Sequence, residues 1–109
     1  MKLSNCSLVT AIFLTAILAG PATAAAAQGK ELYTSSCLKC HGASGEGKGA
    51  IAKMLKVTMR NLSSKEVQAK SDAELTKVIT AGQGKMKPVT GLSEAKAADV
   101  VAYLRTLKP

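Results

Sequence analysis

The sequence is very poor in aromatic side chains, which usually supply much of the buried surface of a small domain. It has no tryptophan, one phenylalanine (Phe13) and two tyrosines, Tyr33 and Tyr103. A chain of 109 residues is expected to form one domain, and a domain of that size is already short of buried surface. The shortage indicates that the core contains something else: a staple, a metal or a large apolar cofactor.

Acidic residues are also scarce. The chain has 7 Asp and Glu against 15 Lys and Arg, which gives a formal net charge of +8. The basic residues are spread singly, without a Lys/Arg block and without an aromatic platform for bases, so the sequence argues against nucleic-acid binding. A surface that docks an acidic protein partner or an anionic membrane face fits this charge better.

A hydrophobic run long enough to span a bilayer is lacking as well. The apolar stretch from Leu8 to Ala19 covers about a dozen residues, whereas a membrane span needs roughly 20. Lys2 precedes this stretch, and Gly20-Pro21 followed by small residues ends it. A positive start, a short apolar region and an Ala-x-Ala exit are typical of a secretory signal peptide rather than of an uncleaved anchor.

Export determines which residues form the domain. We expect residues 1–24 to be the signal peptide, with cleavage after Ala24, although Ala26 or Ala27 would also serve. Residues 25–109 then form one domain in the periplasm, or in another exported or lumenal compartment, and no permanent membrane span is expected. Cleavage at any of these positions removes Cys6.

Convincing strand periodicity is absent, and the first half of the domain mixes helical and loop signals. A short helix is expected over Gln28–Ser36, because Gly29, Leu32 and Tyr33 share one face. Four glycines within residues 42–49 predict a loop. Residues 50–55 fit a helical turn, and residues 59–66 show no clear pattern.

Two clearer helices follow in the second half. Ser71 and Glu74 have the S-x-x-E spacing of a capping box, and Gly82 stands where a left-handed C-terminal cap belongs. Ser93 is expected to cap the last helix. The apolar face of that helix consists of Ala97, Val100, Val101 and Leu104. With residues 83–91 as a loop between them, the fold class is all-α: three to four short helices joined by long loops.

The most informative motif is Cys37-Leu38-Lys39-Cys40-His41. The C-x-x-C-H pattern attaches haem c covalently, one group for one motif. The two intervening residues set the cysteine sulfurs at the spacing of the two vinyl-derived carbons with which they form thioethers. His41, the next residue, is thereby held beneath the iron as a ligand. A covalently bound haem would also supply the apolar mass that the aromatic-poor core lacks.

Three other interpretations of the two cysteines compete with haem attachment. A thioredoxin-like redox pair needs a βαβ setting, and none is visible. A structural zinc site needs four ligands, whereas the chain without Cys6 offers only Cys37, Cys40 and its sole histidine, His41. A structural disulfide is compatible with export, while the signal peptide, the all-α pattern and the aromatic-poor core together favour haem.

A second axial ligand cannot be histidine from the same chain, and a methionine thioether is the obvious partner. Met54 shares an apolar pattern with Ile51 and Leu55, where methionine is usually core filler. Met59 has no clear role. Met86 lies in the loop between the last two helices, next to the stiff Pro88, so position alone favours it while leaving the other two open.

Together these segments resemble class I cytochrome c, the small monohaem group with His/Met ligation. The resemblance covers almost all of the expected domain and is carried by Cys37–Gly42, Gly47–Gly49, Gly84–Pro88 and Asp99–Arg105. It implies the cytochrome c fold wrapped around one haem, with Met86 as the axial ligand. It also implies a crossing of the first and last helices through Gly29 and Tyr33 on one and Val100 and Tyr103 on the other. One departure is Ala50, which stands where the family often has a proline whose carbonyl accepts the N–H of the haem histidine.

If both axial positions of the iron are filled, no coordination position is left for a substrate. The sequence therefore predicts an electron carrier and not an enzyme. A ring of Lys39, Lys48, Lys85 and Lys87 around the haem edge is expected to steer redox partners with acidic docking faces. Two alternatives stay open: a cytochrome subunit of a larger periplasmic oxidoreductase, and a haem gas sensor in which the methionine bond opens.

Overall fold

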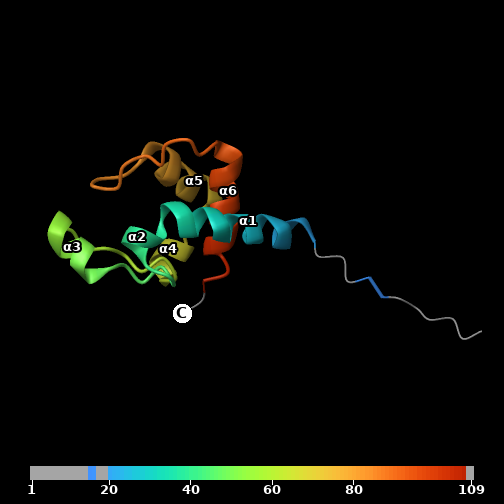
Figure 1. Ribbon diagram of the computed structural model, residues 1–109, viewed down its shortest axis with the longest axis horizontal. Helices are drawn as coiled ribbons and strands as arrows, with labels where there is room; N and C mark the ends of the chain where they lie inside the picture. The colour runs from blue at the N-terminus through green and yellow to red at the C-terminus, as the bar shows by residue number, and fades with distance from the viewer. Residues whose placement is uncertain (1–14, 17–19, 108–109) are drawn as a thin grey trace, which may run out of the picture.

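The computed structural model describes residues 15–16 and 20–107 (Figure 1). Most of the expected signal peptide, residues 1–14 and 17–19, lies outside the described residues. The helices in the described part are α1 (Pro21–Ser36), α2 (Leu38–His41), α3 (Gly49–Leu55), α4 (Lys65–Gln68), α5 (Asp72–Ala81) and α6 (Glu94–Leu104). Across these residues there is no strand, only an isolated bridge between Gln83 and Met86. The all-α expectation is confirmed, and α2 and α4 are single turns.

Helix α1 begins at Pro21, seven residues before the expected start at Gln28, so that prediction was wrong. Proline is tolerated at the first helical position, where its missing N–H costs nothing, and the alanines after it are the strongest helix formers. The added turns extend away from the other helices (Figure 1). None of the helices within residues 20–107 is long and apolar enough to cross a membrane.

The predicted crossing of α1 and α6 is confirmed, and these two helices make the most extensive helix–helix contact. Gly29 lies directly against the backbone carbonyl of Asp99, so that any β-carbon at position 29 would overlap it. The rings of Tyr33 and Tyr103 meet beside this crossing, with centroids 5.2 Å apart and planes tilted by 56°. The absence of a side chain at Gly29 is what allows the two backbones to approach.

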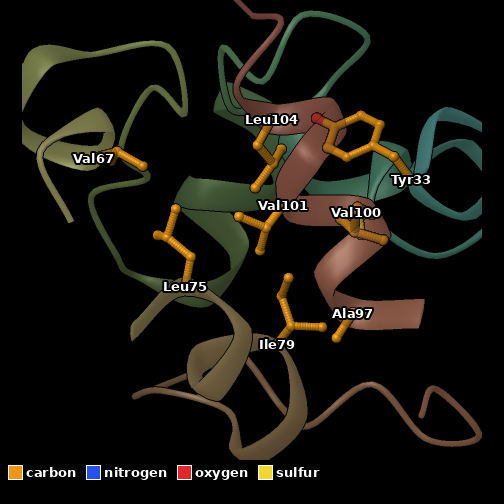
Figure 2. Close-up of a cluster of buried hydrophobic side chains, with 9 residues drawn as sticks. Tyr33, Val67, Leu75, Ile79, Ala97, Val100, Val101 and Leu104 are labelled. Atoms are coloured by element: carbon orange, nitrogen blue, oxygen red, sulfur yellow. The ribbon is translucent and has the colours of Figure 1, made fainter. Parts of the chain in front are cut away.

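The core lies between α1, α5 and α6, with one residue from α4 (Figure 2). Its largest fully buried side chains are Tyr33, Val100 and Val101. Leu75 and Ile79 of α5 face the same cluster, and Val67 reaches it from α4. Among the described residues, the buried set thus contains one aromatic ring, Tyr33, in keeping with the aromatic-poor composition.

The N-terminal caps of α5 and α6 form as predicted. The Ser71 hydroxyl accepts the backbone N–H of Glu74 (3.1 Å), and the Glu74 carboxylate accepts the N–H of Ser71 (2.7 Å), which completes the capping box. The Ser93 hydroxyl accepts the N–H of Lys96 at 3.3 Å. Gly82 ends α5, but with φ 78° and ψ 170° it is not the left-handed helical cap that was expected.

Candidate functional site

A cavity of about 600 Å³ is bounded by four separate stretches of the chain. The α1–α2 junction contributes Cys37, Cys40 and His41, and the loop after α5 contributes residues 83–87 and 89. Residues 55, 57–60 and 62 and the α4–α5 region complete the wall, which is mainly apolar. The four predicted site residues, Cys37, Cys40, His41 and Met86, all line this one cavity although they span 50 positions of the sequence.

The cysteines are placed by two consecutive helical turns. The Cys37 N–H donates to the carbonyl of Tyr33 (2.8 Å), which ends α1, and the His41 N–H donates to the carbonyl of Cys37 (2.9 Å), which forms α2. Residues three apart on a helical turn lie on the same face. Both thiols are free in the described chain, Cys37 buried and Cys40 partly buried.

The Cys37 thiol is not in the environment of a redox nucleophile. Burial raises its pKa, with the neighbouring Cys40 as a second cause, so the protonated thiol is favoured. A thioredoxin-like cysteine needs the opposite, a lowered pKa in an electropositive setting. The site therefore favours cysteines that anchor a group over cysteines that exchange disulfides.

Burial lowers the pKa of His41 and so favours the neutral ring, whose nitrogen lone pair can bind a metal. Within the described part of the chain, its buried Nδ1 atom has no hydrogen-bond partner. Ala50, in the first turn of α3, therefore does not supply the carbonyl that a proline often provides at this position in the family. A buried polar atom without a partner is costly, and the neutral ring leaves its other nitrogen, Nε2, for a bound group.

The backbone around His41 is held by bonds that the sequence did not reveal. The Tyr33 hydroxyl, on α1, donates to the carbonyl of Gly42 at 2.6 Å, and burial raises the Tyr33 pKa to about 12. The N–H of Gly47 donates to the carbonyl of His41 (2.7 Å), and that of Lys48 donates to Cys40 (3.0 Å). The glycine-rich loop thus folds back over the motif and satisfies its carbonyls.

Met86 is positioned by a tight turn that directly follows α5. Gln83 and Met86 exchange two backbone hydrogen bonds of 2.8 and 2.9 Å. A β-carbon on Gly82 would lie only 2.7 Å from the Met86 carbonyl oxygen and 2.8 Å from Pro88. Glycine at position 82, with its positive φ, lets this loop pack against the end of α5 and carry Met86 into the cavity wall.

Of the other two methionines in the expected domain, Met54 differs from the prediction and Met59 acquires a place that the sequence did not indicate. Met54 is 69% exposed, so its interpretation as core filler was wrong. The reason is that α3 makes no extensive contact with the other described helices. Met59 also lines the cavity and lies against Gly47. The cavity therefore offers two thioethers, Met59 and Met86.

The charges around the cavity are all of one sign. Four basic residues line it, namely Arg60, Lys70, Lys85 and Lys87, and no aspartate or glutamate in the described chain does so. Lys85 and Lys87 were expected there, whereas Lys39 and Lys48 are exposed but outside the lining. A large, mainly apolar cavity with a wholly cationic rim fits a large apolar ligand that carries negative groups, as haem does with its two carboxylates.

Comparison with known proteins agrees with this geometry. The family described as cytochrome c oxidase, cbb3-type, subunit III matches residues 24–104. The chain belongs to this family of c-type cytochromes. It is also 34% identical over 88 residues to cytochrome c-554(547) of Halothiobacillus neapolitanus, covering 76% of this chain and 97% of that protein.

Two solved structures share the fold. The KustC0563 c-type cytochrome superposes with a TM-score of 0.64 at 27% identity, covering 74% of this chain and 98% of that one. Cytochrome cL from Hyphomicrobium denitrificans gives 0.62 at 25% identity, covering 81% of this chain but 50% of that longer one. These matches confirm the resemblance and the small all-α cytochrome c fold. Membership implies haem c and haem-based electron transfer.

Proposed function

We propose that this chain is an exported electron carrier that holds one haem c through thioethers to Cys37 and Cys40, with His41 and Met86 as axial ligands. The observation that carries the proposal is their meeting in one cavity of about 600 Å³. When bound, the haem supplies a one-electron ferrous/ferric couple. In keeping with a signal peptide over residues 1–24, the family match begins at residue 24.

The residues of the site are suited to holding this group rather than to catalysis. The cysteines at the end of α1 anchor it, the neutral ring of His41 offers a nitrogen, and Met86 offers a soft sulfur from a rigid turn. A His/Met pair raises the reduction potential. Two protein ligands leave no coordination position for a substrate, and the chain has no second histidine for acid–base work.

Covalent attachment is tested on the full chain, expressed in a cell that exports proteins and matures c-type cytochromes. We expect one haem per chain by pyridine haemochrome assay, haem that stays with the polypeptide through acid–acetone extraction, and an intact mass lacking residues 1–24. The control with both Cys37 and Cys40 changed to Ala should retain no haem. Haem that extracts freely from the unaltered protein would overturn the proposal.

The axial methionine is tested by carbon monoxide binding to the reduced protein near neutral pH. Met86→Ala should bind carbon monoxide and have a lower midpoint potential, because the thioether favours ferrous iron and fills its site. Met59→Leu is the decisive control, since Met59 lines the same cavity and leucine keeps its apolar volume. If Met59→Leu opens the iron and Met86→Ala does not, the ligand assignment is wrong. Carbon monoxide binding by the wild type would instead support the gas-sensor alternative.

The distribution of basic residues in this chain supports a redox partner with an acidic docking face. Residues 47–65 and 75–93, which include α3 and the Met86 loop, contain no acidic residue. Of their eight basic residues, Arg60, Lys85 and Lys87 line the cavity, whereas Lys65 and Lys77 lie outside its lining. Such a one-signed surface attracts partners of opposite charge over long range. The side of the molecule that presents the cavity is therefore proposed as the docking side.

A second candidate function is a cytochrome subunit of a larger periplasmic oxidoreductase. It is favoured by one observation, the oxidase-subunit description of the matching family. The native size of the haem-containing chain in a periplasmic extract separates the two. Elution at the mass of the single chain supports the free carrier, whereas co-elution of all the haem-bearing chain with an oxidoreductase activity supports the subunit.

A further inference from the structure

Lys70 differs from the other three basic residues that line the cavity. Lys85 and Lys87 are exposed, and Arg60 forms an ion pair with Glu66. Lys70 is partly buried, and among residues 15–16 and 20–107 it has no ion-pair partner. The positive charge of Lys70 contributes to lowering the pKa of Glu74, after the hydrogen bonds from Ser71, but the Glu74 carboxylate is already engaged in the capping box with Ser71.

The backbone at Lys70 is held from outside the cavity by Arg105, the residue that follows α6 as its C-cap. Nη2 of Arg105 donates to the carbonyl of Lys70 (2.6 Å) and to Oδ1 of Asp72 (2.8 Å). Nη1 donates to the carbonyl of Gln68 (2.8 Å), and Nε donates to Asp72 (3.0 Å). Arg105 does not line the cavity, yet its planar guanidinium bonds to Gln68 and Asp72, on either side of Lys70 in the chain, and to Lys70 itself. We call this set of hydrogen bonds the Arg105 clamp.

Gln68 connects the Arg105 clamp to Leu62, which belongs to another stretch of the cavity wall. Its side-chain amide donates to the carbonyl of Leu62 (2.8 Å) and to that of Leu104 (3.0 Å), while its amide oxygen accepts from Nη1 of Arg105 (3.2 Å). The end of α6 is thereby tied to the segment from Leu62 to Asp72, which carries Lys70. A guanidinium with this many acceptors fixes a loop more tightly than isolated surface contacts do.

The ammonium group of Lys70 needs an anionic partner once a ligand fills the cavity. The wall on either side of Lys70 along the chain is formed by Val67 and Leu75, and a ligand that fills the cavity displaces the water that would otherwise solvate the charge. A charge that loses its water without gaining a partner is costly. A haem carboxylate would supply the missing negative charge.

We propose that Lys70 binds a carboxylate of the haem and that Arg105 is the positioning residue that holds Lys70 in the cavity wall. The proposal rests on the haem-binding part of the proposed function. It predicts that Lys70 and Arg105 act as one unit, so that the effect of altering Arg105 on the carboxylate is transmitted through Lys70.

The test uses haem-loaded full-chain variants and two readouts: the propionate bending mode in the resonance Raman spectrum, and the midpoint potential. Lys70→Gln should shift the bending mode and lower the potential, because an unpaired carboxylate favours ferric iron. Lys70→Arg should restore both. Lys77→Gln is the matched control, since it removes one positive charge from an exposed site on α5 outside the cavity.

Arg105→Lys keeps the charge but loses the fork, and it should shift both readouts in the direction of Lys70→Gln. In the Lys70→Gln background it should add no further shift, which a double-mutant cycle measures. Asp72→Asn weakens the Arg105 ion pair without removing the bond to the Lys70 carbonyl, and it should lower stability while leaving the bending mode unchanged.

The inference is overturned if Lys70→Gln leaves the bending mode unchanged, or if Lys77→Gln lowers the potential equally, since either result leaves only a general charge effect. Additive effects of Lys70→Gln and Arg105→Lys would remove Arg105 from a positioning role. A bending mode that responds to Arg60→Gln and not to Lys70→Gln would assign the carboxylate to Arg60. Failure of the proposed function looks different, because the wild type would then carry no covalently bound haem.

Discussion

Replacing Gly29 with alanine tests the helix crossing on which the site depends. In isolation the change should stabilise α1, because alanine gains about 0.5–1 kcal/mol over glycine inside a helix. In the folded protein the new β-carbon would overlap the backbone carbonyl of Asp99 on α6. The two effects oppose each other, so the sign of the measured change is informative.

The steric term should win. Adding a methyl group to a well-packed site costs typically about 1–3 kcal/mol, and the upper end applies here because the obstacle is backbone and cannot rotate away. After subtraction of the helix-propensity gain, we expect Gly29→Ala to destabilise the protein by about 2 kcal/mol. At about 4–8 °C per kcal/mol for a domain of this size, the Tm should fall by about 8–16 °C.

The assay is thermal unfolding of the haem-loaded protein, followed by circular dichroism and by the haem absorbance together. Gly49→Ala is the matched control, since position 49 begins α3 and a β-carbon there meets nothing within 4 Å. The control should be neutral or slightly stabilising. A Gly29→Ala variant as stable as Gly49→Ala would refute the close approach of α1 and α6.

Three further predictions concern single side chains. Tyr33→Phe should cost about 1 kcal/mol of unfolding free energy by leaving the Gly42 carbonyl without its strongest donor, and spectrophotometric titration should lose the tyrosine that ionises at about pH 12. The hydrogen bond from the backbone N–H of Ser71 lowers the pKa of Glu74 from its ordinary value, so its carboxylate stabilises the fold above the unfolded-state pKa and the contribution is lost as pH falls through the lowered pKa. Glu74→Gln should therefore flatten the acid limb of stability against pH, and an unchanged acid limb would contradict this. Lys85→Glu should slow electron transfer to an acidic partner more than Lys65→Glu at low salt, and the difference should shrink as salt rises, because the Debye length is about 10 Å at 0.1 M; equal slowing would leave no defined docking face.

Features that depend on neighbouring residues were predictable from the sequence. The capping box at Ser71 and the cap at Ser93 involve residues three apart, so the pattern contains both partners of each bond. The spacing of Cys37, Cys40 and His41 is equally local, because it is one helical turn. The start of α1 was missed because Gly20-Pro21 indicates a break, whereas the same proline also suits the first position of a helix.

Features that depend on which segments meet were decided by the tertiary structure. Met54 is exposed because α3 makes no extensive contact with the other described helices, whereas Met59 lines the cavity. The clamp from Arg105 to Lys70 joins residues 35 positions apart, and no local pattern specifies such a pairing.

The sequence by itself determined the chemistry of this protein: which thiols and which imidazole are available, the positive charge, and a core poor in aromatic residues. Only the tertiary structure decided which of several equivalent residues reach the cavity. Lys70 lines it and Lys39 does not, although Lys39 lies within the motif itself. The physical reason is that motif spacing acts through bonds along one helical turn, whereas the cavity wall is assembled by packing of helices that are distant in the chain.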